Sequence, residues 1–296
     1  MASTVFPVLA FFVNCGLEYI SLYMMRKFLL VIFFSCVLCG IAISQTGLTV
    51  GPPRIYFVAD GGQSQTQFVD VTNPSKDYKL DLAVSFEDWQ YSSLGDNVLS
   101  PNGTLSTSCG AWFSVSEPYF SLLPGETKKL QLNLQVPKGK MYSDSIPVHT
   151  SMLFVTQLNP RTTQEKEGAN IRLALRSGIK LYQRFNGHNN EDLEITDLKL
   201  DKNIDSTKML KLDFHVTGNI WMQGNFRVEF VNQDNGEKLT LDNLTFYCMP
   251  GDKRIQYIAI PKALKSGNYT ATILAFFGES DNVKAAEIDF NHVQQH

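Results

Sequence analysis

The segment Leu130-Gln131-Leu132-Asn133-Leu134-Gln135-Val136 alternates apolar and polar side chains without a break. Successive side chains of a β-strand point to opposite faces of a sheet, so this period of two indicates a strand with one buried face and one wet face. The same alternation returns at Leu80–Phe86, Ile171–Leu175, Leu210–Val216, Phe226–Phe230 and Tyr269–Ala275. The chain is therefore expected to consist of strands, and we find no convincing amphipathic helix of three turns.

Turn-forming residues separate the predicted strands. The pair Asn235-Gly236 is expected to join Phe226–Phe230 to Leu239–Leu241 as a hairpin, because both turn residues tolerate a positive φ. Many short strands with regular turns favour antiparallel sandwiches. The polar stretch Asn186–Asn190 has no hydrophobic period, which indicates a linker. The predicted fold class is all-β, with two immunoglobulin-like antiparallel β-sandwich domains at residues 46–186 and 190–292.

The amino-terminal region carries the features of an export signal. Met25-Arg26-Lys27 places two positive charges ahead of an uncharged apolar run, Phe28–Ile43, and Ala42-Ile43-Ser44 offers small residues at the positions that a signal peptidase reads. The run is shorter than the ~20 apolar residues of a membrane-spanning helix, which argues against the alternative of a membrane anchor. We expect residues 1–44 to be a cleaved signal peptide, with residues 1–24 interpreted as a start assigned too early.

The mature chain is weakly acidic and poor in cysteine. Without residues 1–44, it has 252 residues, of which 24 are basic and 28 are acidic, a net charge of −4. Nucleic-acid binding draws its affinity chiefly from neutralising phosphates, and no basic surplus exists here to support it. Of the cysteines only Cys109 and Cys248 remain. Two lone buried thiols are expected, with a disulfide between them as the alternative.

No motif of catalysis or metal binding stands out. The chain contains no nucleophile elbow, no phosphate-binding loop and no dinucleotide fingerprint. The histidines lie singly, without partners at metal-ligand spacing, at His149, His188, His215, His292 and His296. We therefore predict that the protein is not an enzyme, with no catalytic residue, no metal, no cofactor and no small-molecule substrate. An enzyme whose site is assembled only in the folded chain is kept as an alternative.

Three segments of the predicted first domain form a constellation. Pro53-Arg54-Ile55-Tyr56-Phe57 opens the first strand, Trp112–Leu130 contains an aromatic-x-Val-x-x-Pro stretch and then Leu-x-Pro-Gly, and Ile179-Lys180-Leu181-Tyr182-Gln183-Arg184 ends the domain. In this order the segments resemble the periplasmic chaperones of the chaperone–usher pilus pathway, across Thr49 to Arg184. The resemblance implies a periplasmic protein that binds pilus or fimbrial subunits and delivers them to an outer-membrane usher.

The resemblance also implies how a subunit is held. Pilus subunits of this pathway are sandwiches that lack their last strand, and the chaperone fills the open groove with the last strand of its own first domain, a known example of β-augmentation. By position, Ile171, Leu173 and Leu175 are the donor-strand residues that would enter the groove. The alternative for these three aliphatic residues is the core of the chain's own sandwich. Because an exposed aliphatic edge can pair with another copy of itself, we also predict self-association of the chain.

Two basic residues correspond to the family's carboxylate-binding pair. Arg54 and Lys180 would grip the terminal carboxylate of the subunit and so fix the register of strand pairing. Register matters because a slip of one residue turns every apolar side chain to the wrong face. The alternative is that both residues are solvated charges at the ends of strands.

Two other functions compete with the chaperone. A surface adhesin or carbohydrate-binding sandwich would present clustered exposed aromatic side chains in its loops, for which Trp221 and Tyr247 are the candidates. A pilus subunit would be a single incomplete sandwich with a free amino-terminal extension. The sequence shows a second predicted domain and a full set of strands in the first, which favours the chaperone over the subunit.

Overall fold

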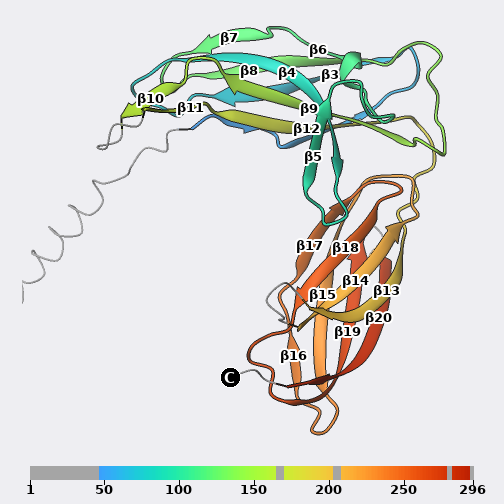
Figure 1. The fold of residues 1–296 in the computed structure, drawn as a ribbon. Coiled ribbons are helices and arrows are strands. Elements are labelled where there is room, and N and C mark those ends of the chain that lie inside the picture. Colours follow the sequence, from blue (N-terminus) through green and yellow to red (C-terminus); the bar gives the residue numbers. More distant parts are fainter. Residues whose placement is uncertain (1–46, 165–169, 203–207, 279–281, 294–296) are drawn as a thin grey trace, which may run out of the picture. The chain divides into compact units, whose positions relative to one another are not determined.

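Strands form nearly every regular element in the described part of the chain (Figure 1). The computed structural model describes residues 47–164, 170–202, 208–278 and 282–293. The predicted signal peptide, residues 1–44, lies outside the described residues. In the described part of the chain, the one helical element is a 3-10 turn, η1 (Gly110–Trp112), and no helix is long and apolar enough to cross a membrane.

Two sheets and a small hairpin make up the first sandwich, residues 47–185. The strands of this sandwich are β1 (Thr49–Gly51), β2 (Arg54–Val58), β3 (Ser64–Thr72), β4 (Leu80–Tyr91), β5 (Asn97–Pro101), β6 (Phe113–Val115), β7 (Tyr119–Leu122), β8 (Thr127–Gln135), β9 (Val148–Gln157), β10 (Arg161–Gln164), β11 (Asn170–Leu173) and β12 (Arg176–Arg184). One sheet has the order β1-β3-β8-β6, and the other has the order β2-β12-β9-β4-β5, with β7 also paired to β4. β10 and β11 form the hairpin.

The core of this sandwich follows the alternation of the sequence. In β8, Leu130, Leu132 and Leu134 are fully buried, while the residues between them are exposed or half-buried. β9 is different, because it is the central strand and is buried on both faces. Leu153 and Val155 of β9 belong to the main core, whereas Met152 and Phe154 pack on the opposite face of the sheet.

The chain changes sheet at the start of the first sandwich. β1 pairs with β3 in one sheet, and two prolines later β2 pairs with β12 in the other. Among the described strand pairs, β2–β12 is the parallel one, and the remaining ladders are antiparallel. The sheet change matters for the site, because it decides how much of β12 is covered by β2.

The second sandwich, residues 193–293, is built in the same manner around its own core. Its strands are β13 (Leu193–Lys202), β14 (Lys208–Val216), β15 (Met222–Asn232), β16 (Lys238–Thr240), β17 (Leu244–Cys248), β18 (Lys253–Ala259), β19 (Gly267–Phe277) and β20 (Asn282–His292). One sheet has the order β13-β14-β18, and the other has the order β16-β15-β19-β20, with β17 also paired to β15. The predicted hairpin is confirmed: β15 pairs with β16, and Gly236 has a φ of +73° in the turn.

The fold class is therefore all-β with two antiparallel sandwiches, as predicted. The buried residues of the two main cores span 55–185 and 193–290, and Asn186–Asn190 between them is exposed and outside any strand. Cys109 lies in the first core and Cys248 in the second, and both are free thiols, so the alternative of a disulfide between them is wrong. The exact domain boundaries stay a prediction.

The predicted strand Ile171–Leu175 is interrupted. β11 ends at Leu173 and β12 begins at Arg176. Across this junction Leu175 faces Gln157 and Leu173 faces Arg161, so three residues, Leu158 to Pro160, lie opposite Ala174 alone. Extra residues on one strand disrupt the ladder locally, which breaks the single strand into two.

Candidate carboxylate anchor and open strand edge

Arg54 and Lys180 lie side by side on neighbouring strands. They are direct register partners in the parallel pair β2–β12, and the N–H of Lys180 donates to the carbonyl of Pro53 at 3.1 Å. Two residues at one register position of adjacent strands point to the same face of a sheet. The structure thus brings together two cations that are far apart in the sequence.

The Lys180 ammonium is held by two aromatic side chains of β4. Its Nζ donates to the hydroxyl of Tyr91 at 2.9 Å and lies 4.2 Å from the ring centroids of both Trp89 and Tyr91. A cation over the face of an aromatic ring is attracted by the ring's quadrupole. Lys180 is therefore a positioned, half-buried cation, and the alternative of a freely solvated strand-end charge does not describe it.

Arg54 also lies over an aromatic ring. Its Cζ is 4.1 Å from the ring centroid of Tyr247 on β17. Its Nε is buried and has no hydrogen-bond partner among the described residues. A buried donor without a partner costs free energy, and an anion that accepts this hydrogen bond would recover it. Protein atoms cover this Nε, so a ligand could accept its hydrogen bond only after the Arg54 side chain moves.

A third cation, Arg254 of β18, completes the cluster. Burial, together with the positive charges of Arg54 and Arg254, lowers the pKa of Lys180 to about 8. Arg254 is paired with Asp252, 3.6 Å from Nη1 to Oδ2. In the described part of the chain, neither Arg54 nor Lys180 forms an ion pair with a carboxylate. We refer to Arg54, Lys180 and Arg254 as the cation cluster. Asp252 balances only one of these three positive charges, so the cluster can still bind an anion.

Aromatic side chains line the cation cluster. Tyr56 stacks on Tyr182 with ring centroids 5.0 Å apart and on Trp221 at 4.9 Å. Trp221 is half-buried in this stack, and Tyr247 is half-buried beneath Arg54. The two residues named for a carbohydrate-binding loop are therefore part of the wall around the cation cluster. Sequence patterns could not show this, because the stack joins residues from both sandwiches.

β12 is open along the half that precedes Lys180. It pairs with β9 from Arg176 to Arg184, but with β2 only from Lys180 onward. Backbone groups alternate in direction along a strand, so the N–H and C=O groups of Arg176 and Gly178 point to the same side as those of Lys180. In the residues described, no strand pairs with β12 on that side before Lys180. We call this stretch, Arg176 to Ile179 together with β11, the open edge.

The predicted donor-strand residues stand at the beginning of the open edge. Leu173 is 67% exposed, and Leu175 is half-buried. The side chain of Ile171 lies outside the described residues. Leu173 is therefore not part of the sandwich core, which was the alternative explanation of its place in the alternating pattern. Whether these three residues act as a donor strand stays a prediction.

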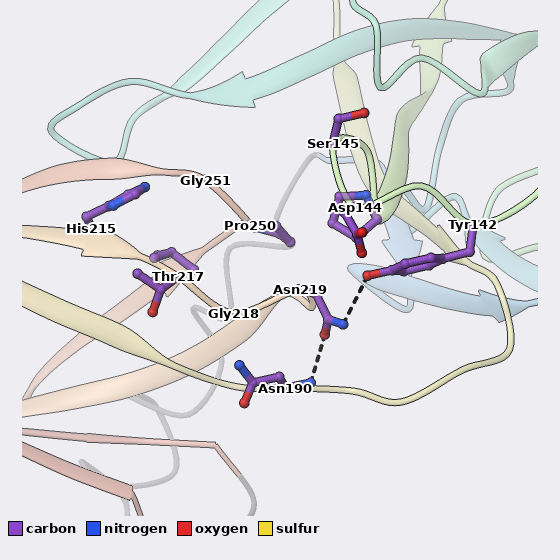
Figure 2. A pocket seen from close by; sticks show the side chains of 12 residues that line it. Tyr142, Asp144, Ser145, Asn190, His215, Thr217, Gly218, Asn219, Pro250 and Gly251 are labelled. Atoms are coloured by element: carbon purple, nitrogen blue, oxygen red, sulfur yellow. Dashed lines mark hydrogen bonds between the residues drawn. The ribbon is translucent and has the colours of Figure 1, made fainter.

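A pocket of about 470 Å³ lies near the linker, and Figure 2 shows its lining. Asn219 connects its two sides, because its Nδ2 donates to the Tyr142 hydroxyl at 3.2 Å and its Oδ1 accepts from the N–H of Asn190 at 2.7 Å (Figure 2). Its described lining includes Asp144 and His215 but no lysine or arginine. The pocket is thus unsuited to a carboxylate, in contrast to the cation cluster.

Comparisons with known proteins give matches among solved structures alone. No family model matches the chain, and no curated protein matches it. Among solved structures, it is similar to the YadV chaperone (11% identity, TM-score 0.44, covering 82% of this chain and 99% of that one). It is also similar to the class 5 fimbriae chaperone CfaA (12% identity, TM-score 0.42, 83% and 99%). A third is the CsuC–CsuE chaperone–tip adhesion subunit complex of Acinetobacter baumannii (13% identity, TM-score 0.43, 82% and 97%).

Proposed function

We propose that this protein is a periplasmic chaperone that captures pilus subunits by donor-strand complementation and passes them to an outer-membrane usher. One observation carries the proposal: the open edge of β12 ends at Lys180 and Arg54, where β2 takes over the edge. Unpaired backbone N–H and C=O groups are a template for a further strand. Arg54 and Lys180, at the end of that template, would fix the position of the guest strand, and we call these two residues the anchor.

The geometry dictates the direction of the guest strand. β12 runs toward Lys180, and β2 occupies its edge from that residue onward. A guest strand with its terminal carboxylate at Arg54 and Lys180 must therefore lie along the preceding residues and run parallel to β12. Main-chain hydrogen bonds would provide affinity, and the alternate side chains around Leu173 would provide the fit to the subunit's groove.

The carboxylate fixes the register of this pairing. The open edge offers a guest backbone several equivalent positions at steps of two residues, and each would present different guest side chains to the chaperone. A terminal carboxylate can reach the cation cluster in one of these positions only. Charge-assisted hydrogen bonds from the Lys180 ammonium and from the Arg54 guanidinium would then select that register.

A peptide test isolates the role of the carboxylate. The probe is a synthetic strand of roughly eight to ten residues, long enough to follow the open edge at ~3.3 Å per residue, with alternating valine and threonine. We expect the free-acid peptide to bind at least about tenfold more tightly than the same peptide with an amidated end, a difference of ~1.4 kcal/mol. Equal affinities of the two peptides in a calorimetric titration would show that Arg54 and Lys180 do not bind the terminal carboxylate. If neither peptide binds, the open edge is not a docking site.

Purification from the cell envelope tests the natural partner. A subunit captured through the open edge should co-purify with the protein, and a photo-crosslinking residue at Leu173 should attach to it. The matched control is the same crosslinker at Val283, an exposed aliphatic residue on β20. Crosslinks to a second copy of this chain at Leu173 would instead identify self-association, the other use of an exposed edge.

A further inference from the structure

Arg254 is held in place from several sides. Its Nη1 donates to the carbonyl of Tyr247 at 2.7 Å and lies 3.6 Å from Asp252. Its side chain is 8% exposed, so a ligand has little access to it. Its Nε is buried and has no hydrogen-bond partner among the described residues. Arg254 is thus a fixed charge behind the cation cluster rather than a group that meets solvent.

The turn between β4 and β5 packs against Arg254. Gly95 in this turn has a φ of +94°, and a Cβ built on it would lie 2.0 Å from Nη2 of Arg254. The neighbouring residue of β18, Ile255, donates its N–H to the carbonyl of Ser93 in the same turn at 2.7 Å. The absence of a side chain at Gly95 therefore allows the guanidinium to approach the turn.

Arg254 and Lys180 share one aromatic ring. The Cζ of Arg254 is 5.1 Å from the ring centroid of Tyr91, and the Nζ of Lys180 is 4.2 Å from the same centroid and 2.9 Å from the hydroxyl. Tyr91 is therefore a physical link between the two cations. Its ring cannot turn without changing its contacts with both of them.

We propose that Arg254 is a positioning residue of the anchor, which fixes the Tyr91 ring and through it directs the Lys180 ammonium toward the site beside Arg54. This inference rests on the proposed function, because it concerns how the same anchor binds its carboxylate. It adds a contribution from the second sandwich to a site whose two ligand-binding residues come from the first. Capture of the carboxylate then requires both sandwiches.

The charged surroundings of Lys180 give the inference a pH signature. The titratable groups that act on Lys180 directly are Arg54 of β2, Tyr91 of β4 and Arg254 of β18. Around them lie Tyr182 and Tyr247, which act on Arg54, and Asp252, which acts on Tyr91. Burial and the two guanidinium groups lower the pKa of Lys180 to about 8. Removal of the charge of Arg254 should therefore raise the pKa of Lys180. Loss of packing that exposes the ammonium would raise this pKa as well, so a variant that keeps the charge is needed to tell the two causes apart.

Charge and position are separated by two substitutions of Arg254. Arg254→Gln should weaken binding of the free-acid peptide at pH 7 roughly two- to tenfold, the range expected for one misdirected hydrogen bond. It should also move the pH at which binding is lost upward. Arg254→Lys keeps the charge and should leave that pH near its wild-type position. Arg227→Gln, an exposed arginine of β15, is the matched control and should change neither property.

Two glycine substitutions test the position of the Arg254 guanidinium without removing any charge. Gly95→Ala forces the Arg254 guanidinium away from the turn, and we expect weaker peptide binding. Gly103→Ala is the control, because Gly103 also has a positive φ, +84°, but nothing lies within 4 Å of its built Cβ. Both substitutions carry the same backbone strain. Equal binding by the two variants would overturn the positioning role.

Failure of this inference can be told apart from failure of the proposed function. The pKa of Lys180 is followed directly by the NMR titration of its side-chain ε-carbon in the free protein, assigned by its loss in Lys180→Arg. If wild type binds the peptide but Arg254→Gln shifts neither this titration nor the binding profile, the role of Arg254 is refuted. If the titration shifts as expected but wild type does not bind the peptide, the proposed function fails on its own. Circular dichroism of each variant shows that it is folded.

Discussion

The first half of β12 and the whole of β20 both lie at the edge of a sheet, yet they present different edges. The acidic side chains of β20 are tied to its neighbours: Glu287 accepts from Thr272 at 2.8 Å, and Asp289 accepts from Thr270 at 2.6 Å. A single lysine lies near each end of β20: Lys284 pairs with Asp192 at 3.1 Å, and Lys208 donates to the carbonyl of Asn291 at 3.4 Å. Charged side chains on an edge discourage further strand pairing. The open edge instead includes the exposed Leu173 and ends at two cations.

The comparison shows that an unpaired edge is not sufficient for docking. β12 differs in combining three features: the exposed apolar side chain of Leu173, unpaired backbone groups, and two cations that would bind the end of an added strand. Each part can be removed separately, so the difference between the two edges can be tested part by part.

Removal of an anchoring cation should have the largest effect. Arg54→Ala or Lys180→Ala should weaken binding of the free-acid strand by ~2–5 kcal/mol, the usual cost of truncating one partner of a buried charged pair. Calorimetric titration measures the loss. Lys284→Ala on β20 is the control, because Lys284 also pairs with a carboxylate, at 3.1 Å from Asp192, but stands on the other edge. An anchor variant that holds the peptide as well as wild type would refute the role of that cation.

Truncation of the exposed Leu173 side chain should have the next largest effect. Leu173→Ala should cost ~1.5–3 kcal/mol of binding to a subunit with an open groove, which is the contribution of one buried leucine. Because Leu173 is exposed in the free protein, its unfolding free energy should change by less than ~0.5 kcal/mol. Val283→Ala on β20 should leave both quantities unchanged. A large loss of stability in Leu173→Ala would place this residue in the core instead.

The pH dependence of binding should be smaller and specific to β12. Lys180 in the free protein has a pKa of about 8, and its protonated form binds the carboxylate. Binding is therefore at full strength below pH 8 and weakens as the pH rises above 8, by at most ~1.4 kcal/mol per pH unit. Lys180→Arg, whose charge persists, should flatten this part of the profile. A wild-type affinity that is constant from pH 7 to 9.5 would contradict the involvement of Lys180.

The anchor should also cost some stability when it is empty of ligand. The folded-state pKa of Lys180 lies below the ordinary value of 10.5, so the charged form destabilises the fold below pH 8, and this cost disappears as the pH rises toward 10.5. Lys180→Gln should therefore raise the unfolding free energy at pH 7 by ~1 kcal/mol, after allowance for solvent screening of a half-exposed group. Urea unfolding at pH 7 and pH 10 measures this, and the gain should shrink at the higher pH. A loss of stability in this variant would show that the Tyr91 hydrogen bond outweighs the repulsion.

Prediction from the sequence reached part of the candidate site. Arg54 and Lys180 were identified from segments that resemble a family, and the structure places them side by side. Arg254 and Tyr91 were missed, because no period or motif connects them to the other two. Their proximity depends on contacts between residues of both sandwiches, such as the packing of Arg254 against the Gly95 turn.

The sequence by itself determined which faces of the alternating strands are buried. In β8 and β19 the side chains of alternate residues face inward, and local alternation is enough to specify this because the geometry of a strand repeats every two residues. Only the tertiary structure decided where β2 begins to cover β12, and hence which half of that edge stays open. It also decided which cations meet, because strand register and the packing of aromatic rings join residues that no local pattern relates.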